Sequence, residues 1–250
     1  QNILLDRFMC FNNQLTTLDV RNGNNMNFIN FDATGNSNLN CVSVDDANWA
    51  TANLTYIDSH TSFSNNCNAV PKTYVPDDNF EAYLETHDAS GNVVSIGDAN
   101  SMGDGIANND SVITANISGV TALNLSNNNT SGGLYITDLT GIEDFTSITF
   151  LNCAQNQLTS LDVSNNTSLS SFRCSHNSLT SLDVSNNTAL TQLYCGSNQL
   201  TSLDVSNNTA LTYFFCGSNQ LTSLDVSNNT ALTNFTCGSN QLTSLDVSNN

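Results

Sequence analysis

Apolar residues in the C-terminal part of the chain recur with a strict period of 21 residues. From residue 158 the segment LTSLDVSNNTSLSSFRCSHNS is followed by three closely related segments, and LTSLDVSNN ends the sequence. Within each segment, apolar and polar residues alternate, which is the pattern of a half-buried β-strand. The repeat therefore predicts short strands that face a common core.

Each segment contains two similar halves. One half is Leu-x-x-Leu-x-Cys-x-x-Asn, at residues 190–198, and the other is Leu-x-x-Leu-x-Val-x-x-Asn, at residues 200–208. A single turn cannot bury these apolar residues, whereas stacked turns share a continuous core between two walls. We expect Asn198 and Asn208 at the turns between the walls, because asparagine tolerates left-handed backbone and bonds turn backbone groups. Asparagines of successive turns would then form hydrogen-bonded ladders.

The beginning of the chain carries weaker copies of this pattern, at residues 8–13, 28–36 and 39–44. The pattern then dissolves into a segment that contains Trp49 and ends near Cys67. This segment is expected to be a cap that covers the open end of a solenoid core.

The sequence TYVPDDNFEAYLETH predicts a short helix over residues 77–87. Proline and two aspartates at 76–78 favour a helix start. The apolar residues at 80, 83 and 84 share one face of such a helix. Almost no other helix is expected in the chain.

These patterns divide the chain into four predicted segments. They are the end of a first repeat array with its C-terminal cap (1–67), a linker (68–72), the N-terminal cap of a second array (73–147), and that array (148–250). Both ends of the sequence fall inside repeats, so we expect a longer tandem protein or a register that continues in a neighbouring copy.

The repeats resemble bacterial surface leucine-rich repeats of the nested 21-residue type, sometimes called IRREKO repeats, with Cys replacing one Leu. A short helix, an acidic loop, ANISGVTALNL and DLTGIEDF follow one another as in the N-terminal cap of internalin-like proteins. The resemblance implies a mainly β, right-handed leucine-rich repeat solenoid of parallel strands with one short cap helix. It also implies a secreted or cell-surface protein similar to adhesins of Bacteroidota-type bacteria, with signal and anchoring segments outside this sequence.

The charge of the chain excludes several partners. Four Lys and Arg residues stand against 22 Asp and Glu residues, which gives a formal net charge of -18. Such a chain repels nucleic-acid phosphates and anionic lipid headgroups. No apolar run approaches the roughly 20 residues of a membrane helix, so membrane insertion is not expected.

The variable positions of the repeat lie beside the inward Leu and face outward. They form two rows: Phe150, Ser171, Gln192, Tyr213 and Asn234, and Asn152, Arg173, Tyr194, Phe215 and Thr236. We predict a ligand-binding face, called the strand face below, at Phe150, Arg173, Tyr194, Tyr213 and Phe215. Alternatively, stacked aromatic residues only tile the wall of the solenoid, as cross-strand pairs do in any sheet.

A row of outward aspartates, Asp183, Asp204 and Asp225, is spaced about 5 Å apart by the turns. Like charges at this distance repel and need solvent, hydroxyl donors or a cation. Hydroxyls of the preceding Thr201 and Ser202 in adjacent turns are the expected partners, and calcium is the alternative.

The loop DANSMGDGIANND suggests calcium more directly. Asp98, Asn100, Asp104 and Asp110 offer hard oxygen ligands in a glycine-rich turn. The EF-hand pattern fails, however, because Met102 occupies a ligand position and the twelfth position is not Glu. A solvated acidic loop without a cofactor is therefore expected, and calcium, the one candidate cofactor, is the alternative.

The eight cysteines fall into two groups. Six occupy core positions of the repeat, where thiols act as small hydrophobes: Cys10, Cys153, Cys174, Cys195, Cys216 and Cys237. Cys41 and Cys67 lie off the period and flank the first cap, so we predict a disulfide between them and an oxidising compartment. A metal site there lacks the expected Cys or His spacing.

No catalytic motif is present, and the three histidines lie in unrelated segments. The chain is therefore expected to be a non-catalytic recognition or adhesion module that binds a glycan or a protein through the strand face. The alternative is a structural spacer or fibre-forming element that contacts copies of itself.

Overall fold

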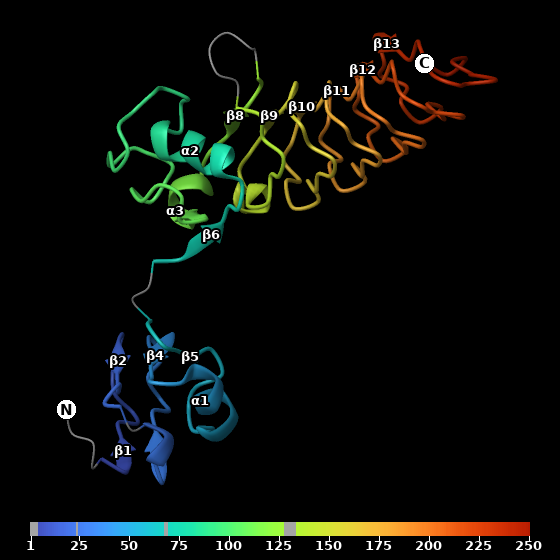
Figure 1. Cartoon of the computed structure of the whole chain (residues 1–250). Helices are drawn as coiled ribbons and strands as arrows, with labels where there is room; N and C mark the ends of the chain where they lie inside the picture. The colour runs from blue at the N-terminus through green and yellow to red at the C-terminus, as the bar shows by residue number, and fades with distance from the viewer. Residues whose placement is uncertain (1–4, 24, 68–69, 128–133) are drawn as a thin grey trace. The chain divides into compact units, whose positions relative to one another are not determined.

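The computed structural model describes residues 5–23, 25–67, 70–127 and 134–250. Contacts divide the chain into two compact units, residues 1–70 and 71–250, and each is described by itself (Figure 1). Residues 68 and 69 of the predicted linker lie outside the described residues.

The second unit is built around a parallel sheet with one strand for each turn of the chain. Its six strands follow the order β13-β12-β11-β10-β9-β8, and Figure 1 shows the turns stacked along this sheet. The strands are β8 (Ala122–Asn124), β9 (Phe150–Asn152), β10 (Ser171–Arg173), β11 (Gln192–Tyr194), β12 (Tyr213–Phe215) and β13 (Asn234–Thr236). Neighbouring strands pair Phe172 with Leu193 and Leu193 with Phe214, so the 21-residue sequence period is also the pairing register. The predicted parallel solenoid is confirmed.

The core lies between this sheet and a second wall of extended chain. Leu193 and Cys195 contribute to it from the sheet, Val205 contributes from the opposite wall, and all three are fully buried. Within the described residues of the array, the second wall carries no assigned strand. Its backbone is instead tied to the adjacent turns by side-chain hydrogen bonds.

Two ladders of asparagine side chains connect successive turns, as predicted. Asn198 Nδ2 donates to the carbonyl oxygens of Cys174 and Cys195 at 3.0 and 3.1 Å, and its Oδ1 accepts the backbone N–H of Leu179. In the second ladder, Asn208 Nδ2 donates to the carbonyl oxygens of Val184 and Asn187. Since both ladders bond to the preceding turn, each asparagine holds two turns in register.

In the turns that follow the strands, the residue with left-handed backbone is not the ladder asparagine, contrary to the expectation. It is the preceding residue, with φ between 55° and 61° at Gln155, His176, Ser197, Ser218 and Ser239. The asparagine is needed for its side-chain amide, which must point inward to reach two carbonyl oxygens of different turns.

The cap of the second unit combines a two-stranded antiparallel sheet with short helices. The strands are β6 (Lys72–Tyr74) and β7 (Ser111–Ile113), and the helices are α2 (Asp78–Thr86), α3 (Thr114–Ile117) and a 3-10 turn at Ile142–Asp144. The predicted helix over residues 77–87 is confirmed as α2. None of the helices in the described residues is long and apolar enough to cross a membrane.

Asp77 connects helix α2 to residues 137–138, in the part of the chain that leads into the array. Its Oδ1 accepts the backbone N–H groups of Asn79 and Phe80 and so caps the helix. Its Oδ2 accepts the N–H and hydroxyl of Thr137 and the N–H of Asp138. Burial alone would raise the pKa of Asp77, but these hydrogen bonds outweigh it and lower the pKa below its ordinary value. The carboxylate is therefore a charged bridge between cap and array.

The first unit repeats the two-wall arrangement on a smaller scale. One sheet pairs β1 (Arg7–Met9) with β3 (Asn30–Asp32), and the other has the order β2-β4-β5 (Leu18–Asp19, Cys41–Ser43 and Ser62–Ser64). Asn36 Nδ2 donates to the carbonyl oxygens of Cys10 and Ala33, and its Oδ1 accepts Leu15 N–H, as in the first ladder of the array. The predicted Cys41–Cys67 disulfide is present.

The expectation that helix is almost confined to residues 77–87 is wrong for the first unit. Helix α1 (Ala47–Asn53) begins after Asp46, whose carboxylate accepts Trp49 N–H, and a 3-10 turn lies at Asn25–Asn27. Helix α1 has only seven residues, so it depends on tertiary packing, here through the buried Ala50, rather than on its own sequence pattern.

The thiols of the array are mostly, but not all, buried. Cys153, Cys174, Cys195 and Cys216 are buried and unpaired, whereas Cys237 is only partly buried because no further turn of the described chain stacks on it. Burial raises the pKa of Cys153 and of Cys216 to about 12 and that of Cys174 and Cys195 well above its ordinary value. These four thiols are therefore held in the unreactive, protonated form.

We expect a thiol reagent to distinguish these two environments. In the native protein, Cys237 should react first and Cys10 more slowly, because burial and then the charge of Asp32 raise the pKa of Cys10, while Cys153, Cys174, Cys195 and Cys216 should react only after denaturant is added. Mass spectrometry of peptides after timed labelling measures this. Rapid native labelling of the four would show that the sheet residues of the array do not face the core.

Substitution of Asp77 should weaken the connection between helix α2 and residues 137–138 and so lower the stability of the second unit. Asp77→Asn leaves buried donors without an acceptor and should lower the free energy of unfolding by about 2–4 kcal/mol. Because the folded-state pKa of Asp77 lies below its ordinary 3.8, the advantage of the wild type should be full above that pH and disappear as the pH falls further. Denaturant unfolding between pH 2 and 7 measures both effects.

Asp78→Asn is the matched control, because Asp78 is the exposed neighbour. It should change stability by no more than about 0.5 kcal/mol. Equal losses in the two variants would contradict the bridging role of Asp77.

Candidate functional site

The predicted strand face lies on the outer side of β9–β12. The middle residue of each strand, such as Leu193, is buried, and the residues before and after it face outward. Tyr213 is 38% exposed, and Phe150, Arg173, Tyr194 and Phe215 are partly buried. The strand register therefore places all five predicted residues on one face.

Four of these residues form a continuous stack across the strands, called the ring stack below. The Arg173 guanidinium lies 5.5 Å from the ring centre of Phe150 and 4.9 Å from that of Tyr194. Tyr194 stacks on Phe215 with ring centres 4.7 Å apart and an interplanar angle of 8°. Tyr213 pairs with Gln192 in the row that also contains Phe150, and no ring or cation contact joins it to the ring stack among the described residues.

Arg173 is held by rings rather than by carboxylates. Neither ion pair of the described residues includes it, and its Nε is buried without a hydrogen-bond partner. A guanidinium placed between two aromatic faces gains cation–π attraction and keeps the orientation of its plane. The ring stack is thus a rigid element with a single positive charge.

A hollow of about 380 Å³ lies at the cap end of the strand face, and we call it the cap hollow. Phe150 lines it on the side of the sheet, together with Ala122, Leu123 and Asn124 of β8. The end of α2 and the following loop line the other side through Tyr83, His87, Asp88, Ser90, Gly91 and Met102. Because Ala122 pairs in register with Phe150, a small side chain lies beside the ring in the lining of the hollow.

Each strand of the array advances by one 21-residue turn, and the turns present variants of Leu-x-x-Leu-x-Cys/Val-x-x-Asn to the core, with Phe at the second Leu position of the sheet half in the turns of β10, β12 and β13. The chain has a leucine-rich repeat fold. Both the parallel sheet and the asparagine ladders follow from this motif.

Comparison with solved structures gives resemblances to internalins and other leucine-rich repeat proteins. The functional domain of InlJ from Listeria monocytogenes, described as including a cysteine ladder, is 29% identical, with a TM-score of 0.47 over 74% of this chain and 47% of that one. A leucine-rich repeat protein of Leptospira interrogans is 22% identical, with a TM-score of 0.44 over 50% and 32% of the two chains. The internalin InlF of L. monocytogenes is 18% identical, with a TM-score of 0.49 over 95% and 75%.

The chain spans less than half the length of the first two of these structures. No protein-family model and no curated protein sequence matches it. The leucine-rich repeat assignment therefore rests on the register and packing of this chain.

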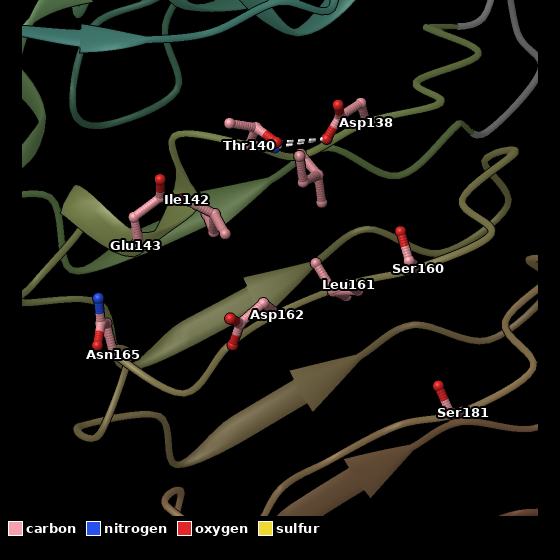
Figure 2. A pocket seen from close by; sticks show the side chains of 10 residues that line it. Asp138, Thr140, Ile142, Glu143, Ser160, Leu161, Asp162, Asn165 and Ser181 are labelled. Atoms are coloured by element: carbon pink, nitrogen blue, oxygen red, sulfur yellow. Dashed lines mark hydrogen bonds between the residues drawn. The ribbon is translucent and has the colours of Figure 1, made fainter.

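A second hollow, of about 430 Å³, lies on the opposite wall of the leucine-rich repeat array (Figure 2). Its carboxylates are already bonded to their own backbone: Asp138 accepts the N–H and hydroxyl of Thr140, and Asp162 accepts the N–H of Ser164. Glu143 accepts the N–H of Gly141 in the same way. Since these acids serve the local turns and no aromatic ring lines the hollow, it is a weaker candidate than the strand face.

The outward aspartate row is stabilised differently from the expectation. Asp204 Oδ1 accepts the backbone N–H of Ser206 at 2.9 Å, two residues further along the same turn, and Asp183 does the same with Ser185. Hydrogen bonds from the side chain and then the backbone of these serines lower the pKa of both aspartates. The preceding Thr201 and Ser202 are not the donors. Each carboxylate is therefore stabilised by a serine of its own turn, while its neighbours in the row still repel it.

The four residues of the predicted calcium loop are used in different ways. Asp98 accepts the backbone and side-chain N–H of Asn100, whereas Asp104 pairs with Lys72 at 2.6 Å. Asp110 lies instead beside Asp78 and Glu81. Among the described residues, no group of three acids, cysteines or histidines within ligating distance contains Asp98 or Asp104. Calcium binding by this loop stays a prediction.

The residues of the cap hollow were not identified from the sequence. The sequence pattern places Tyr83 only on the apolar face of the predicted helix, and His87 and Asp88 carry no repeat signal. The one available signal was Ala122, a small residue in an outward row whose next member is Phe150. The loop that covers the hollow has no periodicity, so its position over the sheet could not be derived.

Phe214 and Phe215 allow a test of the inward and outward assignments in adjacent residues. Phe214 is fully buried, so Phe214→Ala should lower the free energy of unfolding by about 3–5 kcal/mol. Phe215→Ala should cost about 1 kcal/mol, the usual value of a surface aromatic pair. Urea unfolding of both variants measures this difference, and equal losses would show that Phe215 belongs to the core.

Proposed function

We propose that the chain is a non-catalytic recognition module, secreted or displayed at the cell surface, whose strand face binds a protein. The ring stack carries this proposal. It places three aromatic side chains and one arginine, the residue types most enriched at protein interfaces, on an otherwise polar and acidic surface.

The stacking geometry favours a protein over a glycan. A sugar ring binds an aromatic side chain by laying its C–H groups on the electron-rich ring face. Both faces of Tyr194 are already covered, one by Arg173 and the other by Phe215. The edges of Tyr194 remain, and they suit side chains and backbone groups of a protein surface better than the faces of a sugar.

The cysteine chemistry supports the proposed location. A disulfide between Cys41 and Cys67 persists in an oxidising compartment, such as the cell exterior. The array cysteines can remain reduced there because four of them are buried.

The competing function is that of a structural spacer or fibre element whose turns only add length. Near-identical turns suit such a role. The two functions differ in one respect: a spacer needs its core but not the identity of its outward rings.

Selection of binders tests the proposal. Yeast-displayed libraries of extracellular protein domains and a glycan array would be screened against the wild type. We expect protein domains that bind the wild type and lose at least tenfold in affinity for the Tyr194→Ala, Phe215→Ala double variant, since an aromatic anchor contributes about 2 kcal/mol.

The double variant Ser202→Ala, Ser223→Ala is the matched control on the opposite wall. It should bind as the wild type does. Binding to glycans alone would replace the protein partner by a sugar. Binding that persists after loss of both rings would show that the partner contacts another surface and would overturn the strand face proposal. If neither screen yields a ligand, the spacer function is favoured.

A further inference from the structure

The cap hollow continues the ring stack but differs from it in chemistry. Phe150 belongs to both: Arg173 approaches it from β10, and the hollow opens toward β8. A partner that covers the ring stack would therefore extend over the hollow. At this point the repeat ends, so the lining residues are not copies of residues elsewhere in the array.

The cap side of the hollow presents hydrogen-bond acceptors. His87 Nδ1 lies 2.9 Å from the carbonyl oxygen of Tyr83 and 3.1 Å from the hydroxyl of Thr86. Since a carbonyl oxygen can only accept, Nδ1 is the donor in the first contact, and in the uncharged form of the ring Nε2 is the acceptor. No hydrogen bond to Nε2 occurs within the described part of the chain. The Nε2 lone pair is thus available to a donor from outside.

Asp88 adds a negative charge. Its Oδ1 accepts the N–H groups of Ser90 and Asn92, and its Oδ2 accepts Asn92 Nδ2, which leaves lone-pair capacity on Oδ2. Hydrogen bonds from Asn92 lower the pKa of Asp88, so it remains ionised at neutral pH. Among the described residues that line the hollow, it is the one carboxylate, and none of them is Lys or Arg.

Aromatic surface completes the site. Tyr83 stacks on His87 with ring centres 3.9 Å apart, and Phe150 lies across the hollow on the sheet. Burial, and then the charge of Asp88, raise the pKa of Tyr83, so its hydroxyl stays neutral. A flexible aliphatic chain that ends in a cation would pack on these rings and reach the acceptors.

We propose that the cap hollow receives a lysine or arginine side chain of the protein that binds the strand face. This inference rests on the proposed function and adds the chemistry of one partner residue. The overall charge of -18 favours approach of a basic partner, and the hollow supplies a carboxylate, an imidazole acceptor and two rings for its side chain.

NMR titration of the full ¹⁵N-labelled chain tests the site without knowledge of the partner. The probes are N-acetyl-L-arginine amide and N-acetyl-L-lysine amide, with N-acetyl-L-norleucine amide as the uncharged control. We expect saturable shifts of the amides of Asp88, Ser90 and Gly91 with at least one basic probe and none with norleucine. Equal binding of the norleucine probe would show that the hollow is an apolar pocket and would overturn the proposal. Shifts of these amides that do not saturate with either basic probe would overturn it as well.

Two variants test the lining residues. Asp88→Asn retains the Oδ1 that accepts the loop N–H groups and should weaken the basic probe at least fivefold. Ala122→Leu should fill the hollow beside Phe150 and abolish binding, while Ser171→Leu, in the same outward row but outside the hollow, should not. Unchanged amide spectra elsewhere in the chain verify folding. Unchanged affinity in Asp88→Asn would overturn the proposal.

Failure of the cap hollow proposal can be distinguished from failure of the proposed strand face function. Tyr194 and Phe215 do not line the hollow, so their double variant should still bind the basic probes. A selected protein partner could fail to bind this double variant and yet bind Asp88→Asn as tightly as the wild type. That result would support the strand face proposal and overturn the cap hollow proposal.

Discussion

The hydrogen bonds that asparagine side chains make between successive turns are the constraint on which the rest of the structure depends. Asn198 bonds to a carbonyl oxygen of its own turn and to one of the turn before, so a slip by one residue would break both ladder contacts and rotate the apolar residues out of the core. The second ladder is less complete. The amide oxygens of Asn166, Asn187, Asn208 and Asn229 are buried without a partner. An unmade hydrogen bond of this kind costs about 1–3 kcal/mol, so the packing of the Leu and Val residues must exceed that cost in every turn.

The same register governs the outer surface. Because outward residues of adjacent turns are neighbours, both in the sheet and on the opposite wall, equal residues are forced together whether or not they attract one another. Aromatic residues benefit, as Tyr194 and Phe215 show by stacking at 4.7 Å. Aspartates do not, and the array compensates with a serine two residues later in each turn, as Ser206 does for Asp204. A charge row of this kind therefore marks local turn chemistry, and it need not indicate a metal site.

The periodic part of the molecule could be predicted from the sequence because its period fixes strand register, core and outward rows together. This includes Leu193 in the core, Arg173 beside Tyr194 on the surface, and the burial of Cys195. Other features depend on contacts without a period. Helix α1 forms where Asp46 caps it, and the left-handed residue precedes the ladder asparagine, since only an inward amide reaches two turns. The sequence suggests that the acidic loop forms one cluster of ligands. In the structure, Lys72 forms an ion pair with Asp104, and Asp98 accepts a backbone N–H group of its own loop.

The contrast between array and cap bears on where specificity can arise. Near-identical turns present nearly identical surfaces, so a partner that contacted only the repeated positions could bind in several registers one turn apart. The ring stack reduces this ambiguity, because Arg173 occurs in one turn only. The cap removes it, because Asp77 ties α2 to residues 137–138 and thereby places His87 and Asp88 at a fixed position relative to Phe150. A partner side chain that enters the hollow would set the register of the whole interface, in the way that a single polar residue sets the register of a coiled coil. The charged bridge at Asp77 would then serve recognition as well as stability.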